Sequence, residues 1–335
     1  MMTLSRFAVA LLASTGFAAA AHAQASYPCN SDAPNPYHLV TNWAQMPRGW
    51  NPINAVTVDD QNNFWGVDRC EEAGCKAVFE IGPDGKTLKN FGADLFIEPH
   101  QAAVDHDGNL WVADASAKGA KGLQVTKLGP DGRVLLKLGK AGEGLGSAAL
   151  DVFDAPTGIA VLSNGDVFIA QGHGEKPNNS RILKFSKDGK FIKTFAPYGE
   201  GNGQIRSPHA IAVDSQDRLF VGDRSNSRID IFDKDGKFIA AWKQFGRPSG
   251  IAIRNDVLYV IDSQSSDMPG DRYNPGCKRG IRVGSVKDGK VTAYIPPPAP
   301  ADPKWQPAIG VAVDKNGNIF AASDDQHNVV KWVKN

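Results

Sequence analysis

The sequence carries almost no net charge. Among its 335 residues, 37 Lys and Arg oppose 36 Asp and Glu, so the formal net charge is +1 at neutral pH. Lys and Arg are also not clustered along the chain. Because nucleic-acid binding depends on a concentrated basic surface, this composition excludes that class of partner.

Long apolar runs are missing beyond the N-terminal segment, so we expect no membrane span, which would need about 20 apolar residues. Residues 1–23 contain one positive charge, an apolar run of about fifteen residues and the small-residue site Ala21-His22-Ala23. This pattern is typical of a cleaved secretory signal peptide. We therefore predict a signal peptide over residues 1–23 and a secreted or periplasmic protein. The loss of Arg6 brings the mature net charge close to zero.

Cysteine is scarce, with four residues in the chain. An even number in an exported protein favours disulfides. Cys70 and Cys75 are close enough in sequence to form a local bridge, which leaves Cys29 to pair with Cys277, although three pairings are possible. A zinc site built from these cysteines is not expected, because Cys29 and Cys277 lack metal-type spacing.

A sustained apolar period of 3.6 residues is also missing, so long helices are not expected. Instead, one unit recurs, most clearly as EPHQAAVDHDGNLWVADA (residues 98–115) and SPHAIAVDSQDRLFVGDR (residues 207–224). Each copy reads as an apolar strand, a polar turn and a second apolar strand. In most copies an Asp-Gly hairpin follows, as in RILKFSKDGKFIKTF (residues 181–195). One unit is therefore four antiparallel strands.

Six such units predict an all-β fold, a six-bladed β-propeller of four-stranded antiparallel blades. The sixth unit lacks a fourth strand, and residues 38–43 (HLVTNW) alternate like a spare strand. We expect this segment to pair with the last blade and close the ring, so that no bare sheet edge remains. Residues 24–335 then form a single domain, which we expect to be a monomer.

Matched positions in the repeats should form rings around the central channel, because the first strand of every blade lines it. One ring lies five residues before the Asp of each AVD motif or its equivalent: Asn54, His100, Thr157, His209, Ser249 and Ile309. A second ring follows the second strands: Arg69, Ala115, Gly172, Arg224, Ser263 and Asp324. His173 comes directly after Gly172. Imidazoles suit zinc and paired guanidiniums suit a carboxylate, so this mouth is a candidate site for a small acid.

Simpler interpretations apply to the same residues. Each ring histidine has an alternative role as a hydrogen-bond partner of a neighbouring blade's backbone. Arg224 has Asp324 or Asp223 as alternative ion-pair partners, and Arg69 has Asp68. The recurring aspartates of the turns are interpreted as staples of the hairpins: Asp59, Asp105, Asp214 and Asp314.

The segment SPHAIAVDSQDRLFVGDRSNSRIDIF (residues 207–232) resembles the pattern of NHL-repeat propellers. From about residue 54 to the C-terminus, the chain is similar to the peptidyl-α-hydroxyglycine α-amidating lyases. That family holds a zinc ion through three channel histidines, grips the substrate carboxylate with arginines and uses a tyrosine as base. The resemblance implies that His100 and His209 are zinc ligands and that Arg69 and Arg224 are the catalytic arginines.

Two departures from the family pattern concern the last blade and the third blade. The family's third zinc ligand is a histidine in a PHD motif of the last blade, where QPAIGVAVD (residues 306–314) offers Ala308 or Ile309. The missing Asp also removes a residue near the family's structural calcium, so Ca²⁺ is not firmly implied. His173 stands where the family has its base tyrosine, and either completes the metal shell or acts as the base.

The sequence therefore favours a metal-dependent, lyase-like enzyme that acts on a small carboxylate-bearing molecule or peptide. In this hypothesis zinc polarises a hydroxyl, Arg69 and Arg224 hold the carboxylate, and His173 moves a proton near neutral pH. The alternative is a non-catalytic propeller that binds a ligand or a protein. A gluconolactonase-like hydrolase needs a calcium shell of oxygen ligands, for which the ring offers Asn54 but no Glu.

Overall fold

The computed structural model describes residues 29–144, 149–173, 179–298 and 308–335. Apart from one short 3₁₀ helix, η1 (Arg224–Asn226), the regular secondary structure in this part of the chain is all β-strand, so the predicted lack of long helices is confirmed there. Among these residues no helix has the length and apolarity that a bilayer crossing requires. The predicted signal peptide, residues 1–23, lies outside the described residues.

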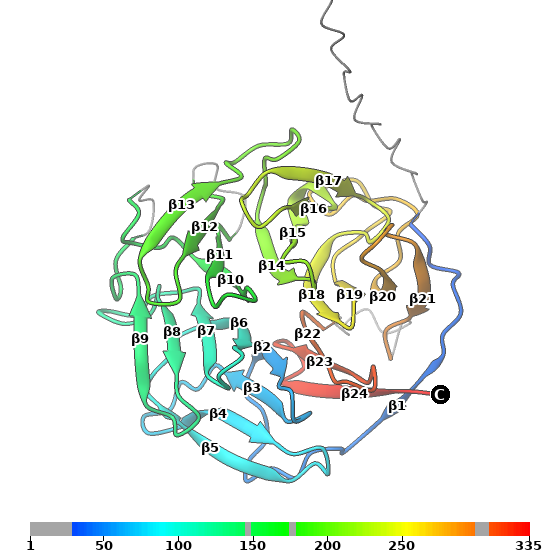
Figure 1. The fold of residues 1–335 in the computed structure, drawn as a ribbon. Coiled ribbons are helices and arrows are strands. Elements are labelled where there is room, and N and C mark those ends of the chain that lie inside the picture. Colours follow the sequence, from blue (N-terminus) through cyan, green and yellow to red (C-terminus); the bar gives the residue numbers. More distant parts are fainter. Residues whose placement is uncertain (1–28, 145–148, 174–178, 299–307) are drawn as a thin grey trace, which may run out of the picture.

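The strands form six antiparallel sheets of four strands each, arranged as blades around a central channel (Figure 1). Blade one contains β2 (Ile53–Val58), β3 (Phe64–Asp68), β4 (Lys76–Ile81) and β5 (Thr87–Ala93). Blade two contains β6 (Pro99–Val104), β7 (Leu110–Asp114), β8 (Val125–Leu128) and β9 (Val134–Leu138). Blade three contains β10 (Pro156–Val161), β11 (Val167–Gln171), β12 (Arg181–Phe185) and β13 (Phe191–Phe195).

The remaining blades repeat this order. Blade four contains β14 (Pro208–Val213), β15 (Leu219–Asp223), β16 (Arg228–Phe232) and β17 (Phe238–Trp242). Blade five contains β18 (Pro248–Arg254), β19 (Val257–Asp262), β20 (Gly280–Ser285) and β21 (Val291–Ile295). Blade six contains β22 (Gly310–Val313), β23 (Ile319–Ser323) and β24 (Asn328–Lys334). The predicted six-bladed propeller is confirmed.

Aspartates fix the tight turns between the first and second strands, as the repeats predicted. Asp105 Oδ1 accepts hydrogen bonds from the backbone N–H groups of Asp107 and Asn109, at 3.0 and 2.9 Å. The same pair of turn contacts is made by the equivalent aspartates: Asp59, Asp214 and Asp314. A carboxylate that accepts two backbone donors holds the hairpin in register.

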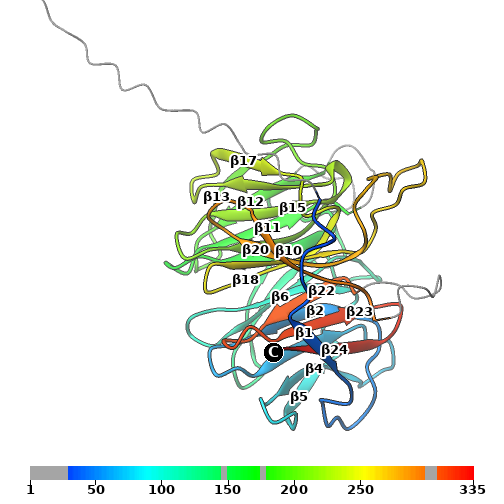
Figure 2. The same cartoon turned by 90° about the vertical axis from the view of Figure 1, so that its right-hand side faces the viewer.

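The ring is closed by β1 (Tyr37–Val40), which pairs antiparallel with β24 and supplies the fourth strand of blade six. The register runs from Tyr37 opposite Lys334 to Val40 opposite Lys331, and Figure 2 shows the two strands side by side at the edge of the ring. The strand begins one residue before the predicted segment and ends before Asn42, which has a positive φ of 54°. The predicted closure is confirmed.

The core is divided into clusters that lie between neighbouring blades. Between blades six and one, Trp43 packs edge-on against Phe64 and Phe320, with ring centroids 5.2 and 4.9 Å apart. Every other pair of neighbouring blades shares a comparable apolar cluster. Burying one large apolar side chain contributes about 1.5–3 kcal/mol, so these interfaces hold the blades in fixed positions around the channel.

A β-bulge occurs near the start of the first strand in five of the blades. The register of the strand pair shifts between the residues on either side of the ring positions Asn54, His100, Thr157 and Ser249, and between Pro208 and Ile211 around His209. A bulge leaves a residue outside the ladder of hydrogen bonds and redirects its side chain. The repeat therefore presents its ring residues from bulges rather than from regular strand.

Both disulfides follow the pairing that sequence proximity suggested. Cys70 joins Cys75 in the loop between β3 and β4, and Cys29 joins Cys277 in the loop before β20. The second bridge fastens the N-terminal segment to blade five, where Ser31 also accepts a 2.8 Å hydrogen bond from Arg282. Two disulfides fit a protein that folds in an oxidising compartment.

Candidate functional site

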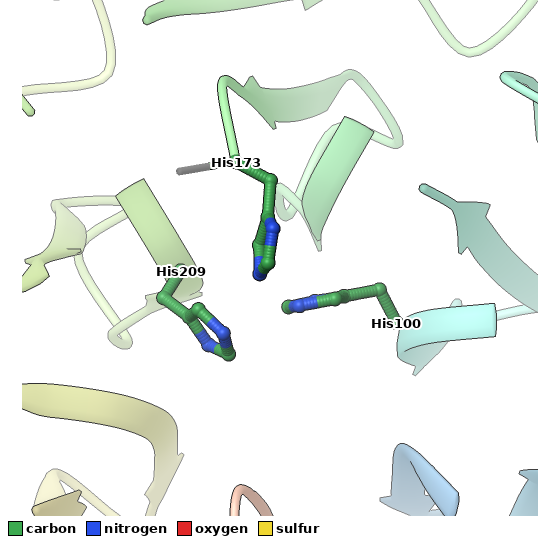
Figure 3. Close-up of side chains that lie close together, drawn as sticks. All are labelled: His100, His173 and His209. Atoms are coloured by element: carbon green, nitrogen blue, oxygen red, sulfur yellow. The ribbon is translucent and has the colours of Figure 1, made fainter. Parts of the chain in front are cut away.

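Three histidines from three consecutive blades converge in the channel (Figure 3). His100 lies on β6, His209 on β14, and His173 follows β11. The ligand atoms of the three imidazoles all lie within 4.8 Å of one another. The ring centroids of His100 and His209 are 4.4 Å apart, and His173 lies 5.4 and 5.3 Å from them. Within the described residues, this is the one group of three or more metal-ligand side chains.

The two ring histidines are both anchored to the backbone of the next blade. His100 Nδ1 bonds the carbonyl oxygen of Thr157 at 2.8 Å, and His209 Nδ1 bonds that of Ser249 at 2.7 Å. A carbonyl oxygen only accepts, so Nδ1 carries the proton and the Nε2 of a neutral ring carries the lone pair. The predicted structural role is thus confirmed, and it leaves one nitrogen of each ring available as a ligand.

His173 reaches the same point because of the residue before it. Gly172 has a φ of 111°, and a Cβ there would lie 2.6 Å from the Ser180 hydroxyl oxygen and 2.7 Å from the Ser180 Cα. Only glycine meets both conditions without strain. The chain therefore turns out of β11 so that His173 enters the channel mouth.

All three imidazoles are held in the neutral form. Desolvation lowers the pKa of His100 and His209 well below the usual value near 6.5, and nearby positive charges lower it further. Desolvation, then Arg224 and Arg69, lower the pKa of His173 to about 4, although this side chain keeps contact with solvent at the mouth. Neutral imidazole is the form that coordinates a metal ion.

Arg69 lies at this mouth with two carboxylates. Its Nη2 is 3.1 Å from a carboxylate oxygen of Glu98 and 3.5 Å from one of Asp324. In the orientation of the Asn54 amide in which both its nitrogen and its oxygen form hydrogen bonds, the oxygen accepts from the same Nη2 at 2.9 Å. Its Nε is buried without a hydrogen-bond partner among the described residues. The predicted pairing of Arg69 with Asp68 is wrong.

The Asp68 carboxylate forms its ion pair with another arginine, Arg48. Arg48 binds it with two hydrogen bonds of 2.6 and 2.9 Å. Asp68 is fully buried at the end of β3, so its carboxylate faces the blade interior, whereas the Arg69 side chain points to the mouth. Adjacent strand residues project to opposite sides, which separates the two.

Arg224 opens the 3₁₀ helix η1 after β15 and is almost fully buried. Its Nη2 lies 3.5 Å from the Ser207 hydroxyl, and its charge lowers the pKa of all three histidines. The Asp223 carboxylate, one of the partners predicted for Arg224, accepts hydrogen bonds from Arg228 and Asn226. Asp324 is the other partner that was predicted for Arg224, and its carboxylate forms the ion pair with Arg69 described above.

Aspartates at the ends of the second strands support the site, and sequence reasoning missed their role. Asp114 accepts the backbone N–H groups of Ile97 and Glu98, at 3.0 and 2.6 Å, just before the Pro99-His100 bulge. Asp223 accepts the N–H of Arg206 at 2.6 Å in the same relation to His209. The recurrence of V-x-D in the repeats was the available signal.

Among the described residues of the last blade, the position at the depth of the histidines is apolar. Ile309 lines the same small cavity as His100, His209 and Ser249, which confirms the predicted ring, and its side chain is apolar. His173 of blade three instead supplies the third imidazole. The exposed histidines His106 and His327 lie in turns and are not part of the cluster.

Comparison with known proteins places this geometry in context. Residues 206–232, which include β16 and His209, match the NHL repeat. Peptidyl-alpha-hydroxyglycine alpha-amidating lyase 2 of Drosophila melanogaster is 30% identical over 209 residues, which cover 56% of this chain and 48% of the fly protein. Peptidyl-glycine alpha-amidating monooxygenase A of Xenopus laevis is 39% identical over 212 residues, or 55% of this chain and 22% of the frog protein. The matched region thus spans half or less of these relatives.

The fold is shared more widely. A streptogramin B lyase structure superposes with a TM-score of 0.57 at 17% identity, covering 89% of this chain and 98% of that one. A gluconolactonase from Xanthomonas campestris superposes with a TM-score of 0.59 at 16% identity, covering 90% of each chain. At such identity these structures establish the propeller fold alone.

Proposed function

We propose that this chain, an NHL-repeat propeller that resembles the amidating lyases, is a zinc-dependent lyase acting on a small carboxylate-bearing molecule or on a peptide that ends in one. The observation that carries the proposal is the meeting of three neutral imidazoles, two of which are fixed with Nε2 available. The arginines at the same mouth supply the complementary site for an anion.

The donor set fits zinc. Three histidine nitrogens are the protein ligands of several catalytic zinc sites, in which a fourth position stays open for water or substrate. Bonds of about 2.0 Å in a tetrahedral shell separate the nitrogens by roughly 3.3 Å, so the histidine cluster needs a small contraction to bind one ion. His100, His209 and His173 would hold the metal, and the last of these replaces the ligand that the resemblance placed in the last blade.

The arginines would orient the substrate. Arg69 and Arg224 come from blades one and four, and both act electrostatically on His173 between them. A guanidinium offers paired donors that match the two oxygens of a carboxylate. The buried Nε of Arg69 is a donor that such a carboxylate would satisfy.

The substrate class follows from the relatives' names, which specify a peptidyl-α-hydroxyglycine and an amidating lyase. In that reaction the hydroxyl proton leaves, the C–O bond becomes a carbonyl, and the C–N bond breaks while nitrogen takes up a proton. Bound zinc would supply a Lewis acid that polarises the hydroxyl. With His173 as a ligand, the proton acceptor is sought among the carboxylates beside Arg69, namely Glu98 and Asp324.

A secreted or periplasmic location belongs to the same proposal. Two disulfides and the N-terminal sequence pattern support it. A gluconolactonase-like calcium shell gains no support, since within the described residues the channel cluster consists of imidazoles. The alternative of a non-catalytic propeller was favoured by the missing third histidine of the last blade, and the position of His173 beside His100 and His209 supports it as the third ligand instead.

The test combines metal analysis with an activity assay. Protein purified without chelator or metal-affinity tag should contain about one zinc per chain and cleave a peptidyl-α-hydroxyglycine substrate. His100→Ala, His173→Ala and His209→Ala should each lose the metal and the activity. His106→Ala, which changes an exposed turn residue, serves as the matched control and should behave as the unaltered protein.

The outcomes separate the hypotheses. Protein that folds, holds no stoichiometric metal and gains none on dialysis against zinc would contradict the proposal and favour a binding propeller. Zinc retained by His173→Ala, together with lost activity, would return His173 to the role of base.

A further inference from the structure

Gln101 crosses the channel from blade two to blade four. Its Nε2 donates to the carbonyl oxygen of Ile211 at 2.7 Å, and its Oε1 accepts from the N–H of Ile211 at 3.1 Å. The two residues lie on β6 and β14, which belong to blades that are not neighbours, because β10 of blade three stands between them (Figure 1). One side chain thus makes both backbone hydrogen bonds of a residue across the channel.

Gly158 on β10 leaves the space through which the Gln101 side chain passes. A Cβ at position 158 would lie 2.9 Å from Gln101 Oε1 and 2.9 Å from Ile211 Cγ1, closer than side-chain carbons approach such atoms. No positive φ is required at Gly158, so the close approach is the reason for glycine there. The bridge and the glycine that accommodates it lie on three successive blades.

The bridge is placed directly below the histidine cluster. Gln101 follows His100, and Ile211 lies two residues after His209. Gln101 lines both the cavity of about 10 Å³ beside His100 and His209 and a cavity of about 200 Å³ further along the channel. Val56, Ile251 and Val311 also line both cavities, and Gln101 is the polar side chain among the four residues that separate the two spaces.

We propose that Gln101 is a positioning residue, which fixes His100 relative to His209 and narrows the channel beneath the histidine cluster, so that a ligand would approach the imidazoles from the side of Arg69 and Arg224. The inference rests on the proposed function, because it assigns Gln101 a role toward the metal that the histidine cluster would bind.

The chemistry of the amide explains why glutamine is suited to bridge these two blades. An amide offers one donor and one acceptor in a plane, which match the C=O and N–H of Ile211 and define the distance between the strands. The Ile211 groups would otherwise face the channel without these partners, and unpartnered buried backbone groups are unfavourable. Groups that orient metal ligands typically change affinity by tenfold to a hundredfold when removed.

The experiment measures Co²⁺, which reports on its own coordination through its visible spectrum. Metal-depleted wild-type protein, Gln101→Met and Gln244→Met are titrated with Co²⁺ against a competing chelator. Gln244 is another buried glutamine whose side chain donates a hydrogen bond to a backbone carbonyl, that of Gly289 in blade five at 3.0 Å, and it lies in the loop that joins β17 to β18. We expect Gln101→Met to bind Co²⁺ about tenfold more weakly with an altered spectrum, and Gln244→Met to bind as wild type.

Gly158→Ala provides a second route, since its methyl displaces the Gln101 amide without removing it. Gly158→Ala should also bind Co²⁺ more weakly and with an altered spectrum. If Gln101→Met fails to fold, the result for Gly158→Ala tests the proposed role of Gln101. Wild-type affinity and spectrum in a folded Gln101→Met or Gly158→Ala protein would overturn this inference alone. Wild-type protein that binds no Co²⁺ or zinc would instead overturn the proposed function, and this inference with it.

Discussion

Arg69 of blade one and Asp324 of blade six form an ion pair, with Nη2 and Oδ2 3.5 Å apart, across the junction where the propeller ring closes. Glu98 of blade two binds the same guanidinium nitrogen at 3.1 Å. The two carboxylates hold Arg69 at the mouth above the histidine cluster. The position of this guanidinium therefore depends on three blades.

Arg69→Lys should weaken substrate binding more than turnover. Lysine keeps the positive charge but loses the paired donors that match a carboxylate, so we expect KM to rise about tenfold while kcat changes less. Steady-state kinetics on a carboxylate-bearing substrate measure both constants. Arg133→Lys, at an exposed arginine that pairs with Asp131, is the control and should leave both unchanged. A KM at the wild-type value would show that Arg69 does not touch the carboxylate.

Zinc should raise the melting temperature of the metal-depleted protein. A ligand present at 100 times its Kd contributes about 2.7 kcal/mol to stability, which corresponds to a shift of about 5 °C in a domain of this size. Differential scanning calorimetry with zinc or with chelator measures it. His173→Ala should remove the shift, whereas His106→Ala, in an exposed turn, should preserve it. An equal shift in His173→Ala would exclude this residue as a ligand.

Asp230→Asn should remove a pH dependence of stability. Burial raises the pKa of Asp230 from 3.8 to about 6, while Arg228 between Asp223 and Asp230 acts in the opposite direction. The folded state therefore binds the proton more tightly than the unfolded state. The resulting stability is complete below pH 4 and is lost as the pH rises through 6.

Urea unfolding at pH 4.5 and pH 7 tests this behaviour. The amide of Asp230→Asn keeps an acceptor for Arg228 and adds a donor beside Asp223, so the variant should gain stability relative to wild type as the pH rises. Asp235→Asn, at an exposed turn in the same blade, should follow wild type at both values. A constant difference between Asp230→Asn and wild type would contradict the prediction.

The two disulfides should differ in their contribution to stability. Cys29 and Cys277 are 248 residues apart in sequence, whereas Cys70 and Cys75 are five apart, and a bridge that closes a longer loop restricts the unfolded chain more. The double variant Cys29→Ser, Cys277→Ser should lose about 2–4 kcal/mol, and Cys70→Ser, Cys75→Ser should lose less. Urea unfolding of both variants measures the difference, and equal losses would contradict the loop-length argument.

The repeats were sufficient to predict the blade count, the ring closure, the turn aspartates and the shared depth of His100 and His209. Those features depend on which residues occupy matched positions in the repeats, and aligning the repeats identifies these residues directly. The partners of Arg69 and the approach of His173 were not predictable in the same way. The first depends on a side chain that reaches two neighbouring blades, and the second on the positive φ of Gly172 directly after β11.

The bridge made by Gln101 was equally hidden, because nothing in the repeat pattern shows that a side chain spans two blades. Glycine at position 158 was visible as part of the TGIAV copy, but its function there depends on a contact from another blade. Sequence periodicity predicts where each residue lies around the propeller axis, but it does not predict which side chains contact a blade on the other side of the channel.

The pairing of β1 with β24 means that the last blade is complete only when the two ends of the chain meet. The three imidazoles come from consecutive blades of one continuous stretch of chain, so they can gather while the circle is still open. The contact of Arg69 with Asp324 requires the first and last blades to meet. The histidine cluster thus depends on contacts among consecutive blades, whereas the complete anion-binding rim exists only in the closed ring.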